Sequence, residues 1–214
     1  MKKAGVDTQL DEKNLPKSTH TGKCIVMVTE DADRTMNTFL GITSTYSYAQ
    51  MDEAALKNSN YLYIEGYLIT SVAGKEAMIK AKKFAQANKV QVALTLSDPG
   101  IVGFFKKDFL DVIGDGVDFI FCNEEEAMSI TETSDVTSAR EKLKSMAKLF
   151  AITQGKNGAI IYDGDTFIDI EPYPTKAINT NGAGDMFAGA FLYAVSQGES
   201  LAAAGKLASL ASSQ

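Results

Sequence analysis

The sequence contains few of the residues that build disulfide frameworks and thiolate metal sites. Its 214 residues include two cysteines, Cys24 and Cys122, each within an apolar, strand-like run, and one histidine, His20, in a polar loop. Two cysteines so placed indicate neither a disulfide framework nor a Cys-x-x-Cys metal site, and the histidine has no Cys or His neighbour with which to bind a metal. This composition fits a reducing, cytoplasmic setting.

The sequence also lacks a surplus of positive charge and a long apolar run. Its formal net charge is −6, and its lysines and arginines are mixed among the acids, so no basic stripe is available to a phosphate backbone or an anionic membrane surface. No apolar run approaches the roughly 18 residues of a membrane span, and residues 1–10 contain no hydrophobic signal region. We therefore expect neither a nucleic-acid nor a membrane partner. With 45% hydrophobic and 22% charged residues, the chain has the composition of a soluble globular protein.

Strand-like and helical patterns alternate from residue 61 onward. The periodicity predicts strands at 61–65, 90–96, 117–121 and 149–153, with helices at 75–87, 104–113, from 124 and at 138–148. Strands separated by helices imply crossover connections and a parallel sheet. Residues 158–162 and 165–170 predict two strands close enough to pair antiparallel, followed by helices ending near 196 and beginning near 200. Before this region, residues 24–29 and 34–41 flank a polar turn and predict a hairpin.

The stretch from Asn179 to Phe191 reads NTNGAGDMFAGAF. Its glycines let the main chain bend sharply at the start of an apolar helix, where free N–H groups and the helix dipole favour an anion such as phosphate. Asp185 beside such a turn has two interpretations. It is a general base that takes a proton from an attacking hydroxyl, or it merely caps the helix or favours its positive end.

These residues, Asn179-Thr180-Asn181-Gly182-Ala183-Gly184-Asp185, resemble the carboxy-terminal signature of the ribokinase-like (PfkB) carbohydrate kinases, Asp-Thr-x-Gly-Ala-Gly-Asp. The stretches THTGKCIVMVTEDADRTM, YIEGYL and NEEEA are most similar to the adenosine kinase branch of that family. The resemblance implies a three-layer α/β/α sandwich with a mostly parallel central sheet and a small β lid. Residues 1–45 would belong to the lid and its connection, and residues 46–214 to the nucleotide-binding core. The family's amino-terminal and extreme carboxy-terminal segments have no counterpart here, so we expect an incomplete acceptor site.

The resemblance also implies an activity, the transfer of the γ-phosphoryl of ATP to the 5′-hydroxyl of adenosine or a related nucleoside in purine salvage. In such kinases the last aspartate of the signature, Asp185 here, is the catalytic base, and the backbone of Gly182, Ala183 and Gly184 forms the anion hole. A ribokinase or another sugar kinase is the alternative within the enzyme class, and a non-catalytic nucleotide-binding fragment is the alternative outside it. A small-molecule substrate and a monomer or homodimer are expected.

Two more motifs have both a structural and a functional interpretation. Asn123 and Glu126 fit a helix capping box; the resemblance implies instead that they organise magnesium and the nucleotide phosphates. Residues 153–158, TQGKNG, contain the Asn-Gly signal of a plain hairpin turn; the resemblance implies that Thr153, Gly155 and Gly158, together with Thr180, bind ATP. No P-loop or protein-kinase loop occurs.

Three other positions complete the expected site. Arg34 either reaches the transferred phosphate, as an arginine does in adenosine kinases, or forms a surface ion pair beside EDAD. Glu65 corresponds to a sugar-hydroxyl ligand in ribokinases, with a helix-start acid as the alternative. Asn179 replaces the usual first aspartate of the signature, a position that helps to hold a potassium-like ion in relatives, so the sequence argues against activation by a monovalent cation.

Overall fold

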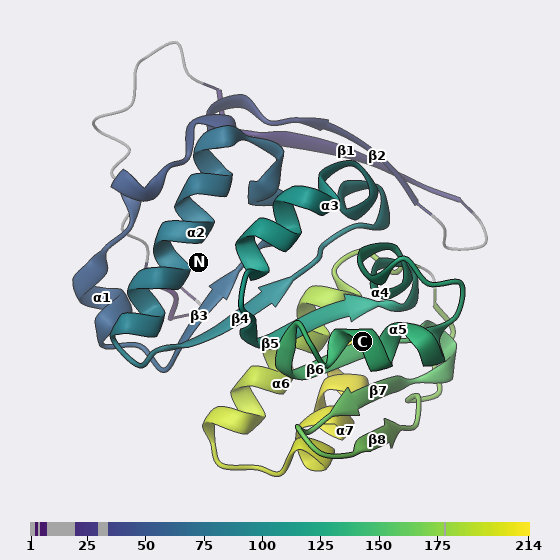
Figure 1. Ribbon diagram of the computed structural model, residues 1–214. Helices are drawn as coiled ribbons and strands as arrows, with labels where there is room; N and C mark the ends of the chain where they lie inside the picture. The colour runs from purple at the N-terminus through teal and green to yellow at the C-terminus, as the bar shows by residue number, and fades with distance from the viewer. Residues whose placement is uncertain (1–2, 4, 8–19, 30–33, 178) are drawn as a thin grey trace.

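The computed structural model describes residues 3, 5–7, 20–29, 34–177 and 179–214 (Figure 1). Within this part of the chain, a six-stranded sheet has the order β3-β4-β5-β6-β7-β8. The first four strands are parallel, and β7 and β8 are antiparallel to their neighbours, as the sequence predicts. The strands of this sheet are β3 (Tyr61–Ile64), β4 (Gln91–Thr95), β5 (Val117–Asn123), β6 (Ala147–Thr153), β7 (Ala159–Tyr162) and β8 (Phe167–Ile170).

The predicted hairpin is also present and forms a separate two-stranded sheet. β1 (Lys23–Val28) pairs antiparallel with β2 (Arg34–Phe39), and the pair extends along one end of the molecule (Figure 1). Several of its apolar side chains are exposed, including Ile25 and Phe39.

Side chains that alternate along the central strands build two apolar layers. Val92, Leu94, Ile120, Phe150 and Ile152 point to a core covered by α2, α3, α4 and α5. The intervening residues point to a second core, which α6 and α7 cover from the opposite side of the sheet (Figure 1). The expected α/β/α layering is therefore confirmed. The helices are α1 (Glu53–Lys57), α2 (Val72–Ala87), α3 (Pro99–Ile113), α4 (Glu124–Thr131), α5 (Val136–Leu143), α6 (Ala183–Ser196) and α7 (Leu201–Ser212).

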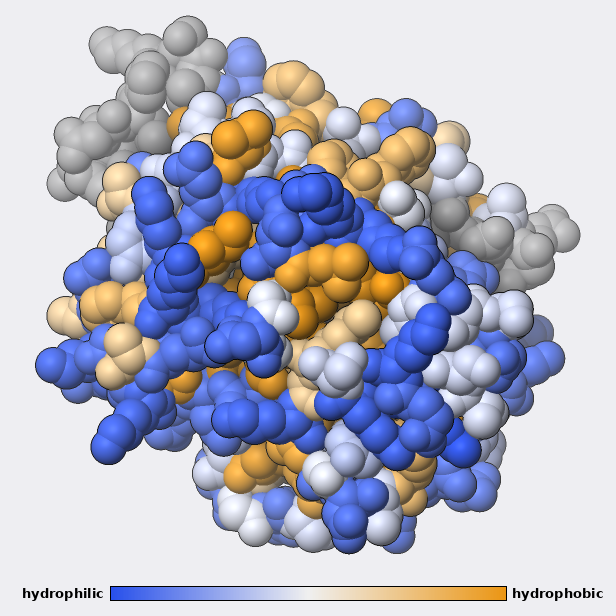
Figure 2. All heavy atoms as spheres, viewed as in Figure 1, coloured by the Kyte–Doolittle hydropathy of each residue, from blue (hydrophilic) through white to orange (hydrophobic). Residues whose placement is uncertain are grey.

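Figure 2 shows the surface seen in the same view, where hydrophilic residues surround a smaller apolar area. In the part of the chain that the structure describes, no helix combines the length and the apolar content that crossing a bilayer requires. Both cysteines are free thiols, Cys24 exposed and Cys122 buried.

The predicted helix at 138–148 is wrong at its carboxyl end. α5 ends at Leu143, and Ala147 already pairs with Val117 as the first residue of β6. Residues 144–148 have a helical sequence pattern, but the pairing of Ala147 with the neighbouring strand β5 outweighs this local preference. Two other helices begin earlier than predicted, because Ser71 and Asp98 cap them through hydrogen bonds from Gly74 N and Ile101 N, both 3.0 Å long.

Aromatic rings hold α6 on the sheet. The ring centroid of Phe191 lies 5.1 Å from that of Phe119 and 5.8 Å from that of Phe121, and these two strand residues stack at 4.6 Å. Phe187, one turn earlier, stacks on Phe191 at 6.2 Å and is buried. Because these contacts lie within about two turns of the start of α6, they determine where the helix begins relative to the ends of the strands.

We predict that Phe191→Ala lowers the free energy of unfolding by about 3–5 kcal/mol, the cost of truncating a fully buried aromatic residue. Tyr193→Ala is the matched control on the same helix, since Tyr193 is 62% exposed, and its effect should stay within about 0.5 kcal/mol. Urea denaturation followed by circular dichroism measures both. Equal losses in the two variants would show that this aromatic cluster does not anchor the helix.

Candidate functional site

The carboxyl ends of the four parallel strands lie at one edge of the sheet, and the predicted site residues gather there. Glu65 directly follows β3, and Asn123 and Thr153 are paired neighbours at the ends of β5 and β6. The start of α6 lies at the same edge. Asp185 is close enough to Glu65 and Tyr63 for its charge to raise the pKa of both groups. Ligands of open α/β folds bind at this edge.

The turn before α6 is open to solvent. Gly182 has a φ of 80°, in the left-handed region that favours glycine, and provides no side-chain cap to the helix. A Cβ atom built on Gly182 or Gly184 would meet no heavy atom within 4 Å, so packing does not require glycine at either position. Among the described residues, no group accepts a hydrogen bond from the N–H of Gly184 or Asp185. The turn therefore presents amides at the positive end of a helix.

The side chain of Asp185 does not cap the helix. It lies in the first turn, is exposed, and within the described part of the chain has no hydrogen-bond or ion-pair partner. Two other hydrogen bonds stabilise the turn before it. Asn181 N donates to Asn179 Oδ1 at 2.9 Å, and Ala183 N donates to Thr180 O at 3.2 Å. Asp185 is therefore not a hydrogen-bonded cap, but it lies in the first turn of α6, where an acid interacts favourably with the positive end of the helix. Its role as a general base stays a prediction.

Glu65 lies half-buried beside this carboxylate. Ser97 Oγ donates a hydrogen bond to Glu65 Oε1 across the ends of β3 and β4. Burial raises the pKa of the Glu65 carboxyl, the hydrogen bond from Ser97 lowers it in part, and the charge of Asp185 raises it further. Glu65 and Asp185 thus lie at the same edge of the sheet, and Glu65 is the more buried of the two.

Tyr63, which the sequence analysis did not single out, also lies at this edge. Burial, and after it the charge of Glu65, raises the pKa of its phenol, with smaller contributions from Asp185 and Glu126. Its ring lies 6.5 Å from that of Phe121, and it remains 38% exposed. The available signal was its position two residues before Glu65 in a strand, which places both side chains on the same face.

Asn123 and Glu126 form the predicted capping box at the start of α4. Asn123 Oδ1 accepts from Glu126 N at 2.8 Å, and the Glu126 carboxylate accepts from Asn123 N at 3.0 Å and from Asn123 Nδ2 at 2.9 Å. The structural interpretation is confirmed, and the magnesium role stays a prediction. Among the described residues, no group of three or more His, Cys, Asp or Glu side chains is arranged to hold a metal ion directly.

The segment after β6 is a tight turn, as its Asn-Gly signal predicts, but a single 3₁₀ turn over Gly155–Asn157 replaces the two-residue form. Gly158 has a φ of 89°, and a Cβ there would lie 2.0 Å from Ile170 O, so the fold itself requires this glycine. Gln154 Nε2 donates to Glu124 Oε1 at 2.8 Å, which ties the turn to the start of α4. The binding of ATP by Thr153, Gly155, Gly158 and Thr180 stays a prediction.

Arg34 is the one predicted site residue whose side chain the structure does not describe. The backbone of Arg34 pairs with Val28 in the hairpin, but its side chain lies outside the described residues, so both interpretations of this arginine remain predictions.

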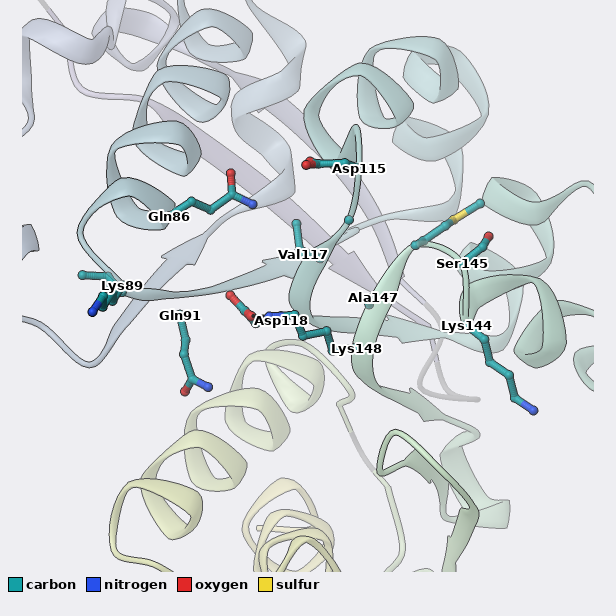
Figure 3. Close-up of a pocket in the computed structure, with 13 residues that line it drawn as sticks. Gln86, Lys89, Gln91, Asp115, Val117, Asp118, Lys144, Ser145, Ala147 and Lys148 are labelled. Carbon is teal, nitrogen blue, oxygen red and sulfur yellow. Dashed lines mark hydrogen bonds and ion pairs between the residues drawn. The ribbon is translucent and has the colours of Figure 1, made fainter.

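A hollow of about 750 Å³ lies at the opposite edge of the six-stranded sheet, where β4, β5 and β6 begin. Figure 3 shows its lining, in which Lys148 and Asp118 form an ion pair of 2.8 Å, and none of the predicted site residues contributes to it.

An open helix start and two acidic groups at the carboxyl edge of a mostly parallel sheet are the features of a small-molecule or nucleotide-binding α/β protein. The sequence profile of the pfkB family carbohydrate kinases matches residues 1–214, and the chain therefore belongs to this family. An adenosine kinase from Schizosaccharomyces pombe is 27% identical over 219 residues, covering 93% of this chain.

Solved structures also match this chain. The crystal structure of adenosine kinase from Sinorhizobium meliloti matches with a TM-score of 0.86 and 33% identity over 90% of this chain, which confirms the ribokinase-like fold. A Ribokinase II from E. coli in complex with ATP and Mg²⁺ matches over 92% of this chain with a TM-score of 0.82, and at 21% identity it shows the fold alone. The present chain spans 63% of the length of the S. pombe enzyme, 59% of the S. meliloti chain and 64% of the E. coli chain.

We predict that Asn123→Ala lowers the free energy of unfolding by about 1–2 kcal/mol, because the first turn of α4 loses its cap and the buried Glu126 loses a donor. Glu125→Ala, an exposed change in the same turn, should stay within about 0.5 kcal/mol. Urea titration compares the two variants. If Asn123→Ala were as stable as Glu125→Ala, the capping box would contribute nothing to the fold.

Proposed function

We propose that this chain is an ATP-dependent small-molecule kinase that transfers the γ-phosphoryl of ATP to the 5′-hydroxyl of adenosine or a related nucleoside. The observation that carries the proposal is the start of α6, where unpaired amides and the exposed Asp185 carboxylate meet at the carboxyl edge beside Glu65. Membership of a family of carbohydrate kinases supports the reaction class, and the adenosine kinase relatives support the acceptor.

In this proposal Asp185 is the general base. A base must be accessible to the acceptor hydroxyl and free of competing partners, and the exposed carboxylate of Asp185 meets both needs in the described part of the chain. As the acceptor oxygen attacks the γ-phosphorus, Asp185 takes the hydroxyl proton, and the bond from the γ-phosphorus to the bridging oxygen of ADP breaks. Positioning and charge stabilisation account for most of the remaining acceleration.

In this proposal the backbone of Gly182, Ala183 and Gly184 receives the charge that develops on the phosphoryl oxygens. Among the described residues, the free donors are the N–H groups of Gly184 and Asp185, because Ala183 N already donates to Thr180 O. Amides at a helix N-terminus are already oriented, so they stabilise this charge without reorganising during the reaction. The lack of any packing reason for glycine at 182 or 184 supports this role, because a bare backbone allows a ligand to approach closely.

ATP would extend from this turn along the ends of β5 and β6, with Asn123, Thr153, Gly155, Gly158 and Thr180 as contacts. The donor set fits a magnesium ion held mainly by the nucleotide phosphates and water, because Mg²⁺ keeps several waters and no direct cluster of ligands exists among the described residues. Asn123 and Glu126 would hold this hydrated ion, which neutralises phosphate charge when bound. The Glu126 carboxylate accepts two hydrogen bonds from Asn123, which fixes its orientation.

The acceptor would lie between Asp185 and the end of β3. Glu65 would accept a hydrogen bond from an acceptor hydroxyl, and Arg34 would reach the transferred phosphate from the hairpin. The carbohydrate kinase family supports a ribokinase or another sugar kinase as the alternative, and Asn179 in place of aspartate supports turnover without a monovalent cation.

Measuring ADP release with adenosine, ribose and 2-keto-3-deoxygluconate as acceptors tests the proposal. Turnover highest with adenosine is expected, and turnover highest with a sugar selects the sugar kinase. If no acceptor supports turnover while ATP binding is retained, the chain is a non-catalytic nucleotide-binding fragment and the proposal fails.

We predict that Asp185→Asn lowers kcat about 10²- to 10⁴-fold, the usual contribution of a general base, while the KM for ATP changes little. Asp165→Asn makes the same chemical change in the exposed β7–β8 turn and should keep wild-type kinetics. Steady-state assays of both variants are the measurement. Wild-type turnover in Asp185→Asn would remove Asp185 from the mechanism.

We predict that Gly184→Ala keeps or raises stability by up to about 1 kcal/mol, because alanine favours the helix and its Cβ meets no neighbour. Its kcat should nevertheless fall on the order of 10²-fold, because the methyl group blocks close approach of the phosphoryl group to the amides. Gly189→Ala is the matched control, in the same helix and equally free of contacts, and should gain stability without losing activity. Unchanged kcat in Gly184→Ala contradicts the anion-hole role.

A further inference from the structure

A small latch joins the ends of β3 and β4 beside the proposed acceptor site. Ser97 Oγ donates to Glu65 Oε1, and the chain at Gly66 passes so close to β4 that a Cβ there would lie 2.4 Å from Thr95 O and 2.6 Å from Ser97 Oγ. Gly66 therefore lets the two strand ends approach, and this approach brings the serine hydroxyl to the carboxylate.

The backbone of Ser97 is in an unfavourable conformation. Its φ is 72°, which makes it one of three non-glycine residues with positive φ in the described part of the chain, with Lys89 and Glu132. Glycine would adopt this conformation without strain, and such strain in a fold accumulates where a side chain has a task. Among the described residues, the hydroxyl of Ser97 hydrogen-bonds only to Glu65, which points to this carboxylate as the partner that the side chain serves.

We propose that Ser97 is a positioning residue for the acceptor: its hydroxyl orients the Glu65 carboxylate so that a remaining lone pair accepts a hydroxyl of a polyhydroxylated acceptor such as a ribose ring. This inference rests on the proposed kinase function. A carboxylate has about four acceptor positions, so the bonds from Ser97 and from the amides of Gly66 and Tyr67 leave capacity for a substrate hydroxyl. Without Ser97 the Glu65 carboxylate would lose the side-chain donor that fixes its position relative to the end of β4.

The charged and titratable groups that face Glu65 set the pH dependence. Asp185 from α6 and the Tyr63 phenol from β3 lie close to it, and the amides of Gly66 and Tyr67 and the hydroxyl of Ser97 favour its ionised form. Removing the serine hydroxyl removes one of these donors, so the pKa of Glu65 should rise. The acidic limb of kcat/KM for the acceptor should then move to higher pH.

Ser97→Gly tests the inference, because glycine removes the hydroxyl and at the same time relieves the backbone strain. Its melting temperature should equal or exceed that of the wild type, while the KM for the acceptor rises about 10- to 100-fold, the scale for losing a hydrogen bond to a charged group, and the KM for ATP stays within about twofold. Lys89→Gly relieves the same kind of strain at the opposite edge of the sheet and should leave both KM values unchanged.

A second measurement does not depend on turnover. In a ¹³C carboxylate NMR titration, with the Glu65 signal identified by Glu65→Gln, the Glu65 pKa should be higher in Ser97→Gly than in the wild type. An unmoved Glu65 pKa, or an acceptor KM that stays at the wild-type value in an active enzyme, overturns the inference. Absence of turnover in the wild type contradicts the kinase proposal instead, and a shifted Glu65 pKa then still shows that the latch exists.

Discussion

The packing of α6 against the aromatic residues of β5 is the constraint on which the rest of the site depends. Phe191 lies on Phe119 and Phe121, with Phe187 one turn nearer the helix start. Because a helix is rigid over such a distance, this contact fixes where its first turn lies relative to the ends of the parallel strands. The first turn of α6, with Asp185, therefore lies near Tyr63 and Glu65, which belong to and follow β3, the edge strand two places from β5.

The glycines near the site differ in whether packing requires them. Gly66 and Gly158 are required by the fold, because a side chain at either position would collide with backbone atoms of a neighbouring segment. Gly184 has no such reason, since it is helical and has free space around it. Gly189 has equally free space, and what distinguishes Gly184 is its place in the first turn of the helix, where a bare backbone allows a ligand to approach the amides. The same reasoning applies in reverse to Ser97, where a residue other than glycine occupies a left-handed conformation.

Much of this architecture could be predicted from the sequence, because strong local patterns specify it. The strands, the parallel order and the capping box at Asn123 follow from periodicity and cap chemistry. The carboxyl end of α5 could not be predicted in this way, since pairing of Ala147 with Val117 is a long-range effect. Tyr63 and Ser97 were missed for a related reason: only the three-dimensional structure shows that the ends of β3 and β4 touch and that α6 begins beside them. The exposed side chain of Asp185 shows that it is not a hydrogen-bonded cap, which the tetrapeptide alone left open, and its role as a base stays a prediction.

The proposed kinase activity requires that the start of α6 receives the phosphoryl group in transfer. A crystal structure of this chain with ADP, aluminium fluoride and adenosine tests the claim most directly, because the fluoride complex imitates a phosphoryl group between donor and acceptor. The account predicts that the fluoride ligands lie within hydrogen-bond distance of Gly184 N and Asp185 N, with the Asp185 carboxylate facing the 5′-hydroxyl. Nucleotide bound instead in the hollow near Lys148, at the opposite edge of the sheet, would contradict it.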